Sequence, residues 1–472
     1  MRAPGQILLL STYELGHAPH HLASPLGFLE RAGFAPKALD LAIEMLDEDA
    51  VRAAALVGIA APMHTAVRLG VTIAERVRAL APSAKIVFYG LYAPLQREAL
   101  VGAGLADELI GGEYEAALVA LASRMEAAAP ALSGASMIVL ERLDFAPPSR
   151  TSLPVITRYA HLITEDGNRS AGYTESSRGC LHMCKHCPIP PVYEGRFFVV
   201  PAGIVLADID VQVAAGARHI TFGDPDFWNG PKHAMAVLQG MHARHPQLSF
   251  DATIKVEHIL KHQKLLPELA SLGCSFIVSA VESRSDHVLA VLDKGHTRAD
   301  IDRALELTDA AGIALRPTLL PFTPMSTYDD YLELLDWIEA RDLSGRVDPV
   351  QLAVRLLIPP GSLLLDVPSV RALIGAYDPV TLSHVWTHPD PRMRALESQV
   401  FTLIEAGTSA GTPAAELFTQ LRALALSVGG GGLATDRAAP PPPRPAAPRL
   451  SEPWFCCAEP TTLQLGAVAA KV

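Results

Sequence analysis

The sequence predicts an α/β protein made of a doubly wound parallel sheet, a partial (β/α)6 barrel, carboxyl-terminal helices and a flexible tail. In residues 1–130, short apolar runs such as Ile7–Leu10 alternate with helical patterns such as Val67–Leu80, which is typical of a parallel sheet with helices on both faces. The alternation resumes after residue 171 and continues for six strand–helix repeats. Repeated units of this kind predict a barrel whose function lies at the carboxyl ends of its strands.

Composition limits the class of protein. The 472 residues are 49% hydrophobic and 19% charged, enough for two or three domains with buried cores. The net charge of −11 disfavours nucleic acid as a partner, because phosphate binding needs clustered Lys and Arg. The amino terminus lacks a signal-peptide core, and no apolar run approaches the length of a membrane span. We therefore expect a cytoplasmic protein without membrane contact.

The domains are expected in a simple order. The parallel-sheet domain covers residues 1–130, a proline-containing connector 131–170, the barrel 171–380, carboxyl-terminal helices 381–426, a disordered Gly/Pro linker 427–450 and a tail 451–472. The expected barrel strands after the first are His219–Phe222, Leu248–Ile254, Phe276–Val281, Ala314–Leu320 and Val350–Leu357.

Three of the six cysteines lie in one loop. Cys180, Cys184 and Cys187 have the spacing C-x3-C-x2-C after an expected strand. Thiolates ligate iron–sulfur clusters, and three cysteines on a four-iron cluster leave one iron open to a small molecule. The alternative is a structural zinc site that also uses His182 and His186, although such sites usually have a second cysteine pair and none lies nearby. Outside the loop, Cys274 is expected to be an inert buried thiol.

The spacing of these cysteines resembles that of the radical SAM superfamily. The resemblance implies a 4Fe-4S cluster whose open iron binds S-adenosylmethionine (SAM), and an electron from the cluster that cleaves SAM to a 5′-deoxyadenosyl radical. It also implies that His186, just before the third cysteine, packs near the adenine. The alternative for His186 is an ordinary solvent-exposed loop histidine.

Two strand ends extend the resemblance to SAM contacts. Gly223, Asp224 and Pro225 follow the second barrel strand, where the superfamily binds the SAM amino group. An ordinary Asp- and Pro-containing turn is the alternative. Glu282 and Ser283 end the fourth strand in a run that resembles G-x-E-S-x-S, which implies that Glu282 accepts the ribose hydroxyls.

Two arginines lie on the later barrel strands. Arg316 is expected on the fifth strand and Arg355 on the sixth. A cation at either place could hold the SAM carboxylate or an anionic substrate, and the alternative is a structural ion pair.

The first 130 residues resemble the cobalamin-binding-type domain that precedes many radical SAM domains, which makes cobalamin a candidate cofactor. The D-x-H-x-x-G stretch that often supplies an axial histidine is absent, and Tyr89–Tyr92 replaces the usual Gly-Gly-x-His. Cobalamin binding is therefore left open. Four histidines at expected strand ends are either ligands or polar loop residues, namely His17, His20, His21 and His64.

The tail carries an adjacent cysteine pair, Cys456 and Cys457, after Trp454 and Phe455. The cysteine loop, the Gly-Asp-Pro-Asp-Phe run and the terminal Cys-Cys-Ala-Glu-Pro together resemble the CUAEP/CCAEP-tail radical SAM protein family, some of whose members have selenocysteine where this chain has Cys457. We expect the pair to be catalytic and redox-active. In the alternative, the aromatic residues anchor the tail and the cysteines are incidental.

The sequence thus predicts a radical SAM enzyme that modifies a small molecule or peptide, by hydrogen abstraction or methyl transfer, with electrons from a donor such as flavodoxin or ferredoxin. The rival is a non-catalytic iron–sulfur or zinc protein acting as redox carrier or sensor. A third class, peptide- or RNA-modifying enzymes, should carry a recognition domain or basic surface that the sequence lacks.

Overall fold

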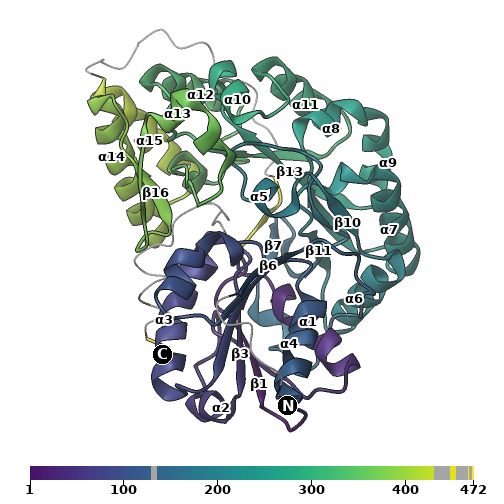
Figure 1. Ribbon diagram of the computed structural model, residues 1–472. Coiled ribbons are helices and arrows are strands. Elements are labelled where there is room, and N and C mark those ends of the chain that lie inside the picture. The colour runs from purple at the N-terminus through teal and green to yellow at the C-terminus, as the bar shows by residue number, and fades with distance from the viewer. Residues whose placement is uncertain (129–134, 430–446, 453–465, 467–469, 472) are drawn as a thin grey trace.

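The computed structural model describes residues 1–128, 135–429, 447–452, 466, 470 and 471. A parallel-sheet domain lies beneath a half-open barrel in Figure 1, and the carboxyl-terminal helices lie beside the barrel. The α/β fold class expected from the sequence is confirmed.

The first sheet has six parallel strands in the order β2-β1-β3-β4-β5-β6. The strands are β1 (Ile7–Ser11), β2 (Lys37–Asp40), β3 (Leu56–Ala60), β4 (Lys85–Tyr89), β5 (Glu108–Gly112) and β6 (Ala135–Val139). The order reverses between β1 and β3, and at such a point a doubly wound sheet leaves a crevice at the carboxyl ends of its strands.

Helices cover both faces of this sheet. Helices α1 (His20–Arg31) and α4 (Glu115–Glu126) pack together on one face, and α2 (Glu48–Ala53) and α3 (His64–Leu80) on the other (Figure 1). Strands β1 and β3 are buried on both faces, which explains why their sequences are continuous apolar runs and do not alternate.

The second sheet forms the barrel, with strand order β14-β13-β12-β11-β8-β7-β17. Five of its strands are parallel, namely β8 (Gly167–Thr174), β11 (His219–Phe222), β12 (Ser249–Thr253), β13 (Cys274–Glu282) and β14 (Ala314–Leu319). Strands β7 (His161–Thr164) and β17 (Arg449–Leu450) extend it antiparallel to their neighbours.

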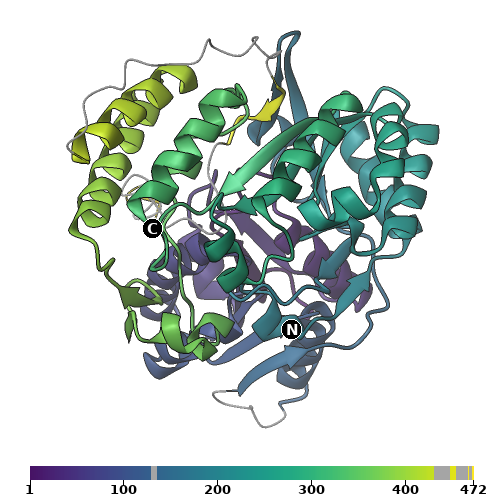
Figure 2. The same cartoon turned by 90° about the horizontal axis from the view of Figure 1, so that it is seen from above.

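Helices between the barrel strands form an outer layer (Figure 2). They are α6 (Ala202–Ala214), α7 (Pro231–Arg244), α8 (Val256–Lys261), α9 (Leu266–Ser271), α10 (Asp286–Leu292), α11 (Arg298–Ala310) and α12 (Tyr328–Ala340). Between β8 and α6 lie the hairpin of β9 (Ser177–Gly179) and β10 (Phe197–Val199) and the short helix α5 (Pro190–Tyr193).

The expected sixth barrel strand, Val350–Leu357, is wrong. Residues Pro349–Leu352 form a 3-10 helix, and beyond it one parallel bridge joins Phe322 to Arg355. Pro359 and Pro360 follow closely and cannot donate hydrogen bonds to a ladder, which disfavours a longer strand here.

The expected connector and linker also differ from the structure at their ends. Strand β6 lies inside the expected connector 131–170 and adds a sixth strand to the first sheet. Strand β17 lies at the end of the expected linker 427–450, where Arg449 and Leu450 pair with β7. The rest of that linker from residue 430 to 446, and the tail residues Cys456 and Cys457, lie outside the described residues.

The last helices follow a short hairpin. The four-residue helix α13 (Pro368–Arg371) comes first, and strands β15 (Ile374–Asp378) and β16 (Ser383–Trp386) then pair antiparallel. After this hairpin, α14 (Pro391–Ser409) packs on α15 (Ala414–Val428). Among the described helices, none combines the length and apolarity that crossing a membrane requires.

Candidate active site

The cysteine loop begins where β9 ends. Asn229 fixes its start, because the Asn229 Oδ1 accepts from the Leu181 amide at 3.3 Å. The Lys185 amide donates to the Leu292 carbonyl at 2.9 Å, and the Lys185 carbonyl accepts from Ser362 at 3.2 Å. The loop is therefore held from several sides and keeps its shape at the carboxyl edge of the barrel.

The three thiols of this loop are free and largely buried. Burial raises the pKa of Cys180 and of Cys187, and the neighbouring loop thiols raise it further. The Lys255 ammonium lies 3.8 Å from the Cys184 Sγ. Lone buried thiols would stay protonated, whereas a metal would hold all three as thiolates beside this cation.

Gly223 and Asp224 lie directly behind the loop. A Cβ on Gly223 would fall 1.8 Å from the Tyr173 hydroxyl, so only glycine fits there. Asp224 is buried and accepts from the Ser176 amide at 2.9 Å and from the Ser176 and Ser177 hydroxyls at 2.7 and 2.6 Å. Burial raises the pKa of Asp224 to about 6 despite these bonds. The carboxylate thus fixes β9, and Pro225 completes the turn.

Glu282 has a strained backbone beside the loop. Its φ is +66°, a left-handed conformation that is uncommon for a residue with a side chain. The buried carboxylate lies 3.3 Å from the Lys294 Nζ and 3.3 Å from the His186 Nε2. Burial alone would raise the pKa of Glu282, but Lys294 and His186 lower it to about 2. The structure therefore brings Glu282 and His186 together, and the adjacent Ser283 caps the turn by accepting from the Ser285 amide.

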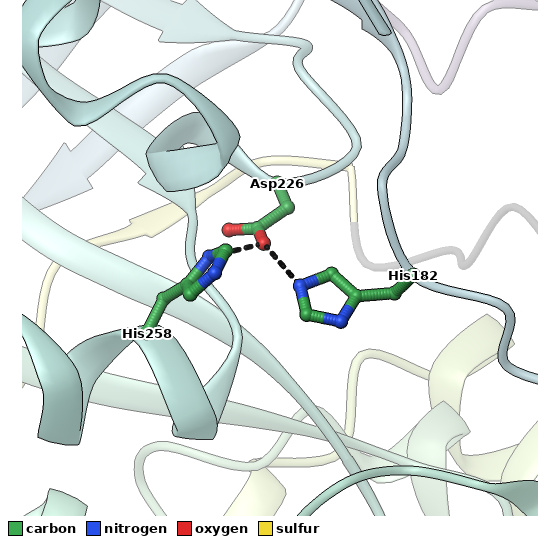
Figure 3. Close-up of side chains that lie close together, drawn as sticks. All are labelled: His182, Asp226 and His258. Carbon is green, nitrogen blue, oxygen red and sulfur yellow. Dashed lines mark ion pairs between the residues drawn. The ribbon is translucent and has the colours of Figure 1, made fainter. Parts of the chain in front are cut away.

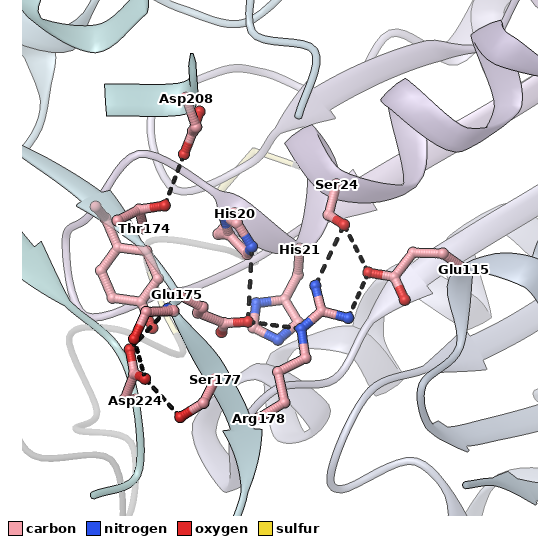
Figure 4. Close-up of polar contacts among 12 residues, drawn as sticks. His20, His21, Ser24, Glu115, Thr174, Glu175, Ser177, Arg178, Asp208 and Asp224 are labelled. Carbon is pink, nitrogen blue, oxygen red and sulfur yellow. Dashed lines mark hydrogen bonds and ion pairs between the residues drawn. The ribbon is translucent and has the colours of Figure 1, made fainter. Parts of the chain in front are cut away.

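A buried network joins the loop to the first domain (Figure 4). The Arg178 guanidinium, just before Cys180, lies 2.7 Å from Glu115, 2.9 Å from Glu175 and 3.7 Å from Glu113. Burial lowers the pKa of Arg178, but these carboxylates hold it well above its usual range. The carboxyl end of β5 and the start of α4 are thereby fixed to the cysteine loop.

Arg316 and Arg355 do not join this group. Arg316 lies 2.8 Å from Asp348 and donates to the Pro448 carbonyl beside β17. Arg355 pairs with Glu397 of α14 and covers the Trp386 ring. Both guanidinium groups are engaged by later segments of the chain, which is the structural ion pair weighed as the alternative.

The histidines of the first domain have different surroundings. His21 lies 3.1 Å from Glu14, and His20 lies 3.6 Å from Glu175. The centre of the His17 ring lies 4.8 Å from that of the Tyr173 ring of the barrel, with the two rings tilted. His64, at the start of α3, is fully buried, and neither ring nitrogen has a hydrogen-bond partner among the described residues. Burial lowers the pKa of His64 to about 3.

Some buried polar residues escaped sequence reasoning. Asp226 and His258 lie beside His182 of the cysteine loop (Figure 3), and Arg178 is the centre of the network that joins the loop to the first domain. Their positions in the sequence could have indicated that Asp226 and His258 lie close together. Both follow adjacent parallel strands, and the carboxyl ends of such strands meet at one edge of a sheet.

Comparison with known proteins places this site in a family. Residues 174–338 match the model of the radical SAM superfamily. The tRNA-2-methylthio-N(6)-dimethylallyladenosine synthase of Sulfurihydrogenibium sp. (strain YO3AOP1) is 27% identical over 191 residues, which cover 36% of this chain and 41% of that protein. The ribosomal protein uS12 methylthiotransferase RimO of Pseudomonas putida (strain GB-1) is 23% identical, over 42% of this chain and 48% of its own. The matched part of the chain spans less than half of the length of either relative.

Solved structures share the fold over most of the chain. The radical S-adenosylmethionine methyltransferase TsrM from Kitasatospora setae, solved with tryptophan substrate and a SAM analog, has a TM-score of 0.64 at 16% identity and covers 84% of this chain and 88% of its own. The cobalamin-dependent radical enzyme OxsB with aqua-cobalamin bound has a TM-score of 0.65 at 16% identity, over 85% of this chain and 67% of its own. The chain therefore carries a domain that matches the radical SAM superfamily at residues 174–338, in a fold that it shares with radical SAM enzymes.

Proposed function

We propose that the chain binds a 4Fe-4S cluster through Cys180, Cys184 and Cys187, and cleaves SAM reductively to modify a small molecule or peptide. The observation that carries this is the gathering of three free thiols in one fixed loop, with Lys255 at 3.8 Å from Cys184 and Lys294 beside Glu282. The two cations offset the negative charge of a thiolate cluster. When bound, the cluster supplies the electron for radical chemistry with SAM.

The residues around the loop suit SAM. Glu282 is a charged, pre-positioned acceptor for two ribose hydroxyls, held by Lys294 at 3.3 Å, and Ser283 stabilises its turn. His186 lies beside Glu282 and would pack near the adenine. Because the Asp224 carboxylate is engaged by Ser176 and Ser177, we assign the SAM amino group to the backbone of the Gly223–Pro225 turn.

The first domain is proposed to hold cobalamin at the carboxyl edge of its sheet. His64 lies there with two buried, unpartnered ring nitrogens, 6.2 Å from the Tyr92 ring, so the edge holds polar atoms that the described residues leave unsatisfied. The fold shared with TsrM and OxsB supports this choice. With cobalamin bound, the chemistry we favour is methyl transfer.

The tail, whose motif resembles that of the CUAEP/CCAEP-tail family, is proposed to work at this same edge. The Ser451 amide donates to the His161 carbonyl at 2.8 Å, and Glu452 packs on Gly16 of the loop after β1. At the other end, the Lys471 Nζ donates to the Leu41 carbonyl after β2 at 2.8 Å. The chain therefore leaves and returns beside one edge, and we propose Cys456 and Cys457 as a catalytic redox pair acting there.

Anaerobic reconstitution tests the proposed function. We expect about four iron and four sulfide per chain and dithionite-dependent formation of 5′-deoxyadenosine. Cys184→Ala should lose both, whereas the matched control Cys274→Ala should keep both, because the Cys274 thiol is buried on β13 and donates to the Phe276 carbonyl. Zinc in place of iron, or a cluster that never cleaves SAM, would favour the rival zinc or redox-sensor function. In the reconstituted wild-type chain, flavodoxin and ferredoxin would also be compared with dithionite as electron donors.

A further inference from the structure

Three side chains converge beneath the cysteine loop without using any of its thiols (Figure 3). The Asp226 Oδ2 lies 2.6 Å from the His258 Nδ1 and 3.6 Å from the His182 Nε2. All three donor atoms lie within 4.8 Å of one another. Asp226 is fully buried, His258 is 6% exposed, and His182 is only partly accessible. Two imidazoles and one carboxylate therefore face a common point inside the protein.

Apart from the ion pairs that they form with one another, these three atoms have no partner in the described part of the chain. The other Asp226 oxygen, Oδ1, accepts from the Lys255 amide at 3.3 Å and the Trp228 amide at 3.4 Å, which fixes the carboxylate. The facing atoms, Asp226 Oδ2, His258 Nδ1 and His182 Nε2, are buried and lack a hydrogen bond of good geometry to any described residue. Buried polar atoms are rarely left so, and three that face one another indicate a missing partner.

A second carboxylate lies on the Nδ1 side of the outer histidine, beyond direct hydrogen-bond distance. The Glu257 Oε2 lies 3.6 Å from the His182 Nδ1 and 3.6 Å from the Lys255 Nζ. Carboxylates on the far nitrogen are typical of metal-bound histidines, because they keep the proton there and aim the lone pair of the other nitrogen at the ion. The Glu257 carboxylate is thus placed to leave the His182 Nε2 as a donor.

We propose that His182, Asp226 and His258 bind one divalent first-row transition ion, zinc or ferrous iron. Two imidazoles and a carboxylate suit both ions and leave positions for water. The site is distinct from the cysteine site, because none of its donors is sulfur. His182 lies between Cys180 and Cys184, so the ion ties the cysteine loop to α8 and to the turn after β11.

Metal analysis of the reconstituted wild-type chain tests the site. We expect about one ion per chain beyond the four irons of the cluster. X-ray absorption at the zinc edge should show nitrogen and oxygen at about 2.0–2.1 Å without sulfur at about 2.3 Å. If iron occupies the site, Mössbauer spectra should show mononuclear high-spin ferrous iron. A zinc–sulfur shell, or no ion beyond the cluster, overturns the proposal.

Variants separate the two sites. His258→Ala and Asp226→Asn should weaken binding of the extra ion at least about tenfold while keeping the cluster iron. The matched control is His262→Ala, whose ring lies 5.8 Å from His258 and outside the trio; it should keep both metals. Cys184→Ala should lose the cluster and keep the ion. Equal metal content in the wild type and His258→Ala would mean that the three side chains form only a hydrogen-bonded network.

Discussion

Two buried polar clusters lie next to the cysteine loop, and they differ in how their buried charged groups are paired. Before the loop, the Arg178 guanidinium meets three carboxylates, so a permanent cation offsets part of the buried negative charge. Glu115, at 2.7 Å, and Glu175 are two of the three (Figure 4). Beneath the loop, one carboxylate meets two imidazoles whose facing atoms lack hydrogen bonds among the described residues (Figure 3). Both clusters contain buried polar atoms without a hydrogen bond among the described residues, but the first holds a permanent cation, whereas the second offers two imidazoles and a carboxylate to an ion. The first therefore fixes the two domains, and the second is suited to bind.

Removing the central charge of the first cluster should have the largest effect on stability. Arg178→Met leaves Glu113, Glu115 and Glu175 buried without their cation, and breaking a buried ion pair from one side costs about 3–5 kcal/mol. Urea unfolding followed by circular dichroism measures the loss. Arg196→Ala is the control, because its pair with Glu194 is exposed and should contribute below about 1 kcal/mol. Equal small losses in both variants would show that the Arg178 cluster is not structural.

Zinc should stabilise the second cluster and leave the first unaffected. A free concentration about 100 times the dissociation constant raises the unfolding free energy by about 2.7 kcal/mol if only the folded chain binds. The increase should appear in Cys184→Ala, where the cysteine site is broken, and vanish when His258→Ala is added. Persistence of the increase in the double variant would place the zinc elsewhere.

His64 is a third kind of buried polar group, a ring whose nitrogens have no hydrogen-bond partner among the described residues. Its effect on stability should be smaller and depend on pH. Burial lowers the pKa of His64 from 6.5 to about 3. Below pH 6.5, the unfolded chain therefore binds a proton on His64, whereas the folded chain does not. Stability is therefore lost as pH falls from about 6.5 towards 3. His64→Leu should gain about 2 kcal/mol relative to wild type between about pH 7 and about pH 5. The exposed His287→Leu should show no such gain, and a flat difference for His64→Leu would contradict its burial as a neutral ring.

Sequence reasoning reached the fold and the cysteine loop because both are local patterns. The apolar runs of β1 and β3 and the spacing of the three cysteines are visible within a few residues. The sixth barrel strand failed because β-propensity in residues 350–357 competes with the prolines that follow. For Arg316 and Arg355 the sequence left a ligand contact and a structural ion pair both open, because a strand position does not reveal which later carboxylate, Asp348 or Glu397, will pair with each arginine.

The proposed metal-binding trio shows more clearly what could not be predicted from the sequence. His182, Asp226 and His258 are far apart in the chain and share no spacing rule, so only the meeting of strand ends brings them together. The turn after β11 could be singled out from the sequence, but Asp224 was chosen from it. The structure shows that Asp224 faces Ser176 and Ser177 while Asp226 faces the two histidines.

The central claim, that the cysteine loop holds a cluster that binds SAM, is tested most directly by electron paramagnetic resonance of the reduced, reconstituted chain. Addition of SAM should change the cluster signal in the wild type and in Cys274→Ala, because the iron without a protein ligand gains new ligands. Glu282→Gln should weaken the response, since Glu282 beside His186 is assigned to the ribose. A cluster signal that SAM leaves unchanged at saturating concentration would contradict the account.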